Sequence, residues 1–142
     1  MGNVAQTTQK INFEDMQMVY KNPEIYLLIN TLATNEQECL IKGTVHFQQE
    51  EALMNKYIRG NIKHQVHIVL YGKNSNDESV YKKYQQLISL GFVNVYMYSG
   101  GLFEWLMLQD IYGLDEFPTT SKQLDILKYK PCQRLHIGLI DN

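Results

Sequence analysis

The stretch VHIVLYGKNSNDESVYKKYQQLISLG, residues 66–91, predicts a strand, a loop and a helix in succession. Residues 66–71 form an unbroken apolar run, which is typical of a strand buried on both faces of a sheet. Residues 77–90 place four apolar side chains on one helical face. They are Val80, Tyr84, Leu87 and Ile88. A loop between strand end and helix start is where α/β folds usually place their chemistry, because free backbone N–H groups converge there.

Elements of the same two kinds alternate on both sides of this stretch. Strands are expected over 25–29 and 93–98, helices over 13–20, 48–59 and 101–110, and a further short extended segment over 40–47. Asn12 can cap the first helix, with Asp15 placed to reach back to it. This alternation with short connections predicts an α/β domain, in which a small parallel sheet is flanked by helices on both faces.

The tail from Gly113 has a different character. A turn at 117–121 should lead into a short capped helix that ends near Lys128, and residues 135–140 are strand-like. No internal repeat or low-complexity linker separates this tail from the rest. We therefore expect one domain over 11–112, with 113–142 as a C-terminal extension packed on it.

Composition narrows the classes of function. The 142 residues carry a net charge of −2 without a basic stripe, so binding to nucleic acid is not favoured. No apolar run approaches the ~20 residues that span a bilayer. The chain begins Met1-Gly2-Asn3, but Gln6 stands where a myristoylation site has Ser or Thr, so lipidation of Gly2 is not expected.

Thiols and imidazoles offer no obvious site. Cys39 and Cys132 are not in CxxC spacing, and no secretory signal peptide is recognised in the sequence. Both observations favour a reducing, intracellular setting. Cys39 is interpreted as a small buried hydrophobe, and nothing marks Cys132 as activated. The side chains of His64 and His67 would point to opposite faces of the sheet, so they are not expected to share a metal ion. No cofactor is expected either. The 10 tyrosines fit either a core role or a protein-binding face.

Several motifs together resemble the rhodanese domain over roughly 11–112. They are Leu27-Leu28-Ile29-Asn30, Cys39-Leu40-Ile41-Lys42-Gly43-Thr44-Val45, Ile68-Val69-Leu70-Tyr71-Gly72, Leu90-Gly91-Phe92-Val93-Asn94-Val95, and Ser99-Gly100-Gly101 with Trp105. The combination LGF-x-NVY and SGG-x3-W is the most specific part. The resemblance implies a rhodanese fold, with the active loop between the fourth strand and its helix and with Trp105 as a core anchor.

The departures from the family pattern fall in that loop. Active rhodaneses carry the catalytic cysteine directly after the strand, where this chain has Gly72. A basic residue late in the loop is replaced by Asp77 and Glu78, and Asn30 and Leu32 replace the acidic and basic residues after the previous strand. The loop also resembles the longer loop of the cell-cycle phosphatases that share this fold.

Physical chemistry also indicates that this loop is catalytically inactive. Sulfur or phosphoryl transfer through a covalent intermediate requires a thiolate, which glycine cannot supply. Asp77 or Asn76 is expected to cap the following helix. The remaining candidates for ligand binding, with no catalytic residue and no metal ligand among them, are Gly72, Lys73, Asn74, Ser75, Asn76 and Ser79.

Two hypotheses remain open. The first is a catalytically inactive rhodanese-like domain that serves as a protein-interaction or structural module; the second is a phosphatase- or sulfurtransferase-related enzyme, or an oxyanion-binding protein, that uses the modified loop 72–79. Ile11-Asn12-Phe13-Glu14-Asp15, residues 106–113 and residues 117–131 also resemble rhodanese-like proteins of large cytoplasmic DNA viruses. That resemblance implies a domain that acts in host cytoplasm or in the virion. The first hypothesis implies a protein partner, and the sequence leaves the oligomeric state open.

Overall fold

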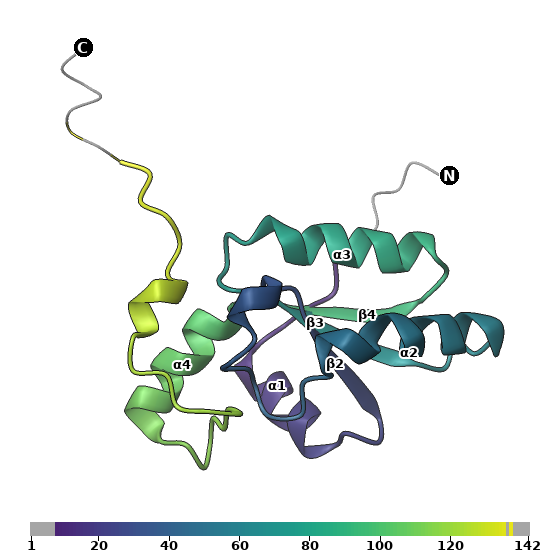
Figure 1. Ribbon diagram of the computed structural model, residues 1–142, viewed down its shortest axis with the longest axis horizontal. Helices are drawn as coiled ribbons and strands as arrows, with labels where there is room; N and C mark the ends of the chain where they lie inside the picture. The colour runs from purple at the N-terminus through teal and green to yellow at the C-terminus, as the bar shows by residue number, and fades with distance from the viewer. Residues whose placement is uncertain (1–7, 136, 138–142) are drawn as a thin grey trace.

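The computed structural model describes residues 8–135 and residue 137. In chain order, its elements are β1 Lys10–Ile11, α1 Phe13–Lys21, β2 Tyr26–Asn30, η1 Thr34–Glu36, α2 Phe47–Arg59, β3 His67–Tyr71, α3 Glu78–Ser89, β4 Asn94–Tyr98, α4 Gly101–Tyr112 and η2 Ile126–Tyr129, the η elements being 3-10 helices. The strands form one parallel sheet in the order β1-β4-β3-β2 (Figure 1). Within the described part of the chain, no helix has the length and apolar character to cross a membrane.

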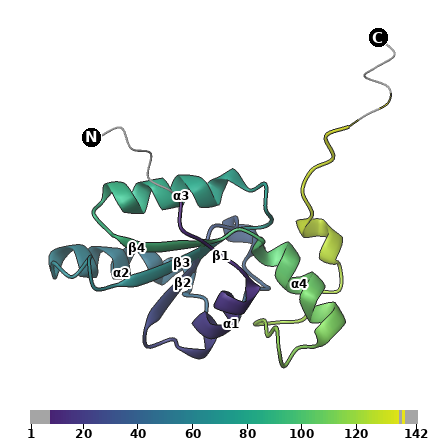
Figure 2. The same cartoon turned by 180° about the vertical axis from the view of Figure 1, so that it is seen from behind.

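Side chains that alternate along the strands divide the core into two layers. On β3, Val69 and Tyr71 lie in the cluster formed with α1 and α4, while Ile68 and Leu70 lie in the cluster formed with α2 and α3. All four are essentially inaccessible to solvent. This burial on both faces is what an unbroken apolar strand predicts, and it confirms the α/β prediction of a parallel sheet between two helical layers (Figures 1 and 2).

Most predicted elements are confirmed to within two residues at each end. The first helix begins as expected, because Asn12 accepts a hydrogen bond from the Asp15 N–H at 3.0 Å and its own N–H donates to the Asp15 carboxylate at 3.1 Å. The prediction missed β1, which has two residues. The strand-like pattern over 135–140 falls mainly on residues outside those described.

The extended segment predicted over 40–47 is wrong. The chain turns there, with Gly43 at a φ of +90° and the Thr44 N–H donating to the Ile41 carbonyl at 3.2 Å. Only two isolated bridges form, Leu28 with Thr44 and Ile41 with Thr119. As a result, the loop of interest follows β3, the third strand in chain order, rather than a fourth strand.

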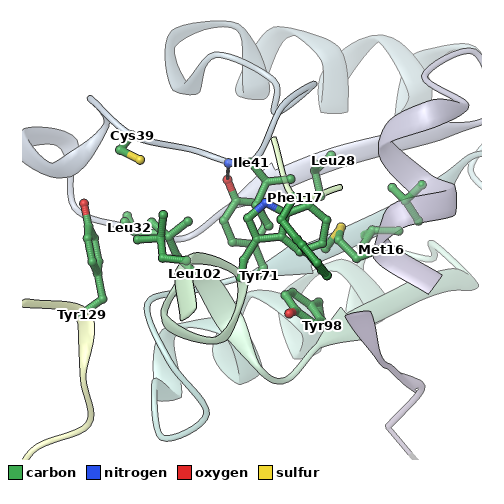
Figure 3. Close-up of a cluster of buried hydrophobic side chains, with 14 residues drawn as sticks. Met16, Leu28, Leu32, Cys39, Ile41, Tyr71, Tyr98, Leu102, Phe117 and Tyr129 are labelled. Carbon is green, nitrogen blue, oxygen red and sulfur yellow. Dashed lines mark hydrogen bonds between the residues drawn. The ribbon is translucent and has the colours of Figure 1, made fainter. Parts of the chain in front are cut away.

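The segment 117–129 closes over the layer that contains α1 and α4. Phe117 and Tyr129 are buried in the same cluster as Tyr71 (Figure 3). The backbone also pairs on both sides of the bridge between Ile41 and Thr119. The Lys42 N–H donates to the Pro118 carbonyl at 3.1 Å, and the Thr120 N–H donates to the Leu40 carbonyl at 2.8 Å. These contacts anchor the two ends of the segment to the domain, while the residues between them are mostly exposed.

Buried tyrosines predict a loss of stability in alkaline solution. Burial, and secondarily the Glu104 carboxylate, raises the pKa of Tyr98 far above its usual value of 10.0, and burial likewise raises the pKa of Tyr71. Above pH ~10, the unfolded chain releases protons that the folded chain retains, so the free energy of unfolding should fall as pH rises, by about 1.4 kcal/mol per pH unit for each such tyrosine.

Urea unfolding at a series of pH values from 8 to about 12 measures this dependence. Tyr98→Phe should reduce the slope above pH ~10 and leave the slope below ~9 unchanged. An identical alkaline slope in the Tyr98→Phe variant would contradict the assignment of this loss to Tyr98.

Candidate functional site

The predicted loop 72–79 lies at the carboxyl edge of the sheet, where residues 72–77 join β3 to α3 and residues 78–79 begin α3. It borders an open hollow of about 810 Å³. The hollow is lined by Thr8, Lys10, Thr31, Leu32, Ala33, Glu36, Lys73, Asn74, Ser75, Asn76, Asp77, Glu78, Ser79, Tyr81, Met97, Cys132 and Arg134. Five of the six candidate loop residues therefore face one space, and Gly72 is buried behind them.

Asp77 fills the polar interior of this loop. Its carboxylate accepts hydrogen bonds from the Lys73 N–H at 2.8 Å and from the Ser79 N–H at 3.0 Å. The Ser79 hydroxyl lies 2.6 Å from the same carboxylate. Asp77 is thus the N-cap of α3, one of the two caps considered from the sequence. Two loop N–H groups that could hold a bound anion, those of Lys73 and Ser79, are therefore already taken by this carboxylate.

Gly72 has no room for a side chain. A Cβ atom added there would lie 2.5 Å from Asp77 Oδ2 and would also overlap Cγ2 of Val80. Val80 is 5 % exposed and belongs to the core, so it cannot swing aside without disturbing α3. The space next to the strand end is closed by the residues of this chain.

The loop is also fixed from behind by α4. The Leu102 and Phe103 N–H groups donate to the carbonyls of Gly72 and Lys73, both at 2.9 Å. Gly101 makes this approach possible, because its φ is +70° and a Cβ there would lie 2.8 Å from the Asn74 nitrogen. The loop backbone is therefore held on two sides.

Several loop side chains are already engaged by partners outside the loop. The Lys73 ammonium lies 2.7 Å from the Glu36 carboxylate. Ser79 and Thr31 share a hydrogen bond of 2.8 Å between their hydroxyls, and the Asn74 side chain donates to the Tyr129 carbonyl at 2.9 Å. Of the polar side chains in 72–79, those of Ser75, Asn76 and Glu78 are exposed.

The two cysteines occupy contrasting environments. Cys39 is fully buried, its thiol donates to the Ser121 carbonyl at 3.3 Å, and burial raises the pKa of that thiol. Cys132 is exposed and lines the hollow beside the loop. Sequence reasoning missed this placement of Cys132, because it depends on the path of the tail across the domain. Within the part of the chain that the structure describes, no three His, Cys, Asp or Glu side chains gather as metal ligands.

Thiol labelling should separate the two cysteines. Brief iodoacetamide treatment of folded protein at pH ~8 should modify Cys132, because only thiolates that solvent can reach react quickly. Cys39 should react only in denaturant. Peptide mass spectrometry measures both sites, and equal modification of Cys39 in folded protein would contradict its burial.

Comparisons with known proteins agree on the fold. The family model described as a rhodanese-like domain matches residues 15–108. No curated protein matches the chain significantly. Among solved structures, Ygr203w, described as a yeast protein tyrosine phosphatase of the rhodanese family, is 15% identical with a TM-score of 0.57, and the match covers 86% of this chain and 99% of that chain.

Two further structures are similar at the same level. The single-domain sulfurtransferase RDL2 of Saccharomyces cerevisiae is 14% identical, with a TM-score of 0.53 and coverage of 81% of this chain and 99% of that chain. The Alr3790 protein of Anabaena is 20% identical, with a TM-score of 0.55 and coverage of 83% and 97%. These likenesses show a shared fold.

Proposed function

The chain belongs to the rhodanese-like domain family, and on that premise we propose that it is a catalytically inactive member that serves as a protein-interaction module. Its relatives by fold include proteins described as a single-domain sulfurtransferase and as a tyrosine phosphatase. Covalent transfer of sulfur or phosphate requires a nucleophile, such as a thiolate, next to groups that stabilise the negative charge. The proposal is that this chain has lost the thiolate, and that Asp77 occupies two of the loop N–H groups that would stabilise an anion, those of Lys73 and Ser79.

The contact between Asp77 and the loop backbone carries the proposal. The carboxylate takes the Lys73 and Ser79 N–H groups, and it also blocks the position that a side chain at Gly72 would need. A substrate oxyanion would have to displace a covalently tethered carboxylate. In addition, Glu78 lines the same hollow and repels anions.

Activity assays test this directly. We expect purified protein to show no thiosulfate:cyanide sulfurtransferase activity and no phosphatase activity above a buffer control, and no thermal shift with phosphate, sulfate or thiosulfate. A turnover that rises in proportion to protein concentration and survives further purification would refute the proposal.

A second function keeps one specific observation in its favour. Cys132 and Arg134 line the hollow together with Lys73, so a thiol from the extension faces the loop. In this alternative, the chain is a sulfurtransferase- or phosphatase-related enzyme whose nucleophile comes from the tail. Cys132→Ser decides between the two functions: activity in the original chain that this variant lacks would establish the alternative. Cys39→Ser is the matched control, since the Cys39 thiol is buried.

The cellular setting is part of the same proposal. The resemblance of residues 106–113 and 117–131 to rhodanese-like proteins of large cytoplasmic DNA viruses supports a viral domain that acts in host cytoplasm or in the virion. Such a domain would act through a protein partner. The structure locates those segments in α4 and the closing segment 117–129.

A further inference from the structure

We draw no further inference here: the strongest candidate, the hollow of about 630 Å³ between α2 and α3 that shares Thr31, Leu32 and Ser79 with the hollow beside loop 72–79, carries none, because its Lys83 ammonium is already paired with the Glu50 carboxylate at 2.7 Å and nothing in the structure shows what covers it.

Discussion

Trp105→Ala should lower the free energy of unfolding by about 3–5 kcal/mol, the range for removal of a large aromatic side chain from a packed core. Trp105 is 0% exposed, and its ring meets those of Phe117, Tyr20 and Tyr98 edge-on, with centroid separations of 5.0, 6.0 and 6.2 Å. Its indole Nε1 also donates to the Pro118 carbonyl at 3.1 Å. The substitution therefore leaves a cavity and removes one of the two hydrogen bonds that the Pro118 carbonyl accepts, the other coming from the Lys42 N–H.

This loss is large compared with the roughly 5–15 kcal/mol that stabilises a typical domain. The effect should also extend to the segment 117–129, because Trp105 contacts both Phe117 and Pro118. We expect faster proteolysis in 113–125 than in the unmodified protein. Since Trp105 is the only tryptophan, unfolding must be followed by circular dichroism in urea instead of by tryptophan fluorescence.

Two variants serve as controls. Trp105→Phe retains an aromatic ring and loses the N–H donor, so its loss of unfolding free energy should lie between zero and the loss for Trp105→Ala. Leu127→Ala alters a residue that is 62% exposed, and its effect should stay within about 0.5 kcal/mol. A loss below about 1 kcal/mol for Trp105→Ala would mean that the segment 117–129 is not anchored by this ring.

The sequence predicts the parts of the fold that depend on neighbouring residues. The Asn12 cap acts over three residues and the Asp77 cap over two, so both can be read from local pattern, as can the apolar run of β3. The sheet class follows from the order of such elements. The two clusters on either side of the sheet then follow from the alternation of side chains along each strand.

Features set by distant contacts could not be predicted. The two residues of β1 are a strand because Lys10 pairs with Met97 and Ile11 pairs with Tyr98. Cys132 reaches the loop because the tail passes Asn74, whose side chain donates to the Tyr129 carbonyl 55 residues away. The closure of the Gly72 position likewise needs Val80 and Asp77 in three dimensions, although the loop was recognised from its sequence alone.

Gly72→Cys should destabilise the protein and create no sulfurtransferase. A Cβ at this position would overlap Val80 Cγ2 and lie 2.5 Å from Asp77 Oδ2. Overpacking of this kind typically costs ~1–3 kcal/mol, and displacement of the Asp77 cap costs ~1 kcal/mol more. We therefore expect a loss of about 2–4 kcal/mol in urea unfolding.

Ser75→Cys is the matched control, since it adds a thiol to an exposed position of the same loop and should leave stability nearly unchanged. The combined variant Gly72→Cys with Asp77→Ser tests whether Val80 or Asp77 is the main obstacle to a side chain at position 72. Serine can still cap α3, and it removes both the negative charge and part of the overlap, so this variant should recover stability relative to Gly72→Cys alone. If Gly72→Cys alone folded normally and transferred sulfur from thiosulfate, the Asp77 carboxylate would not close the loop, and the proposed loss of catalysis would reduce to a single missing thiol.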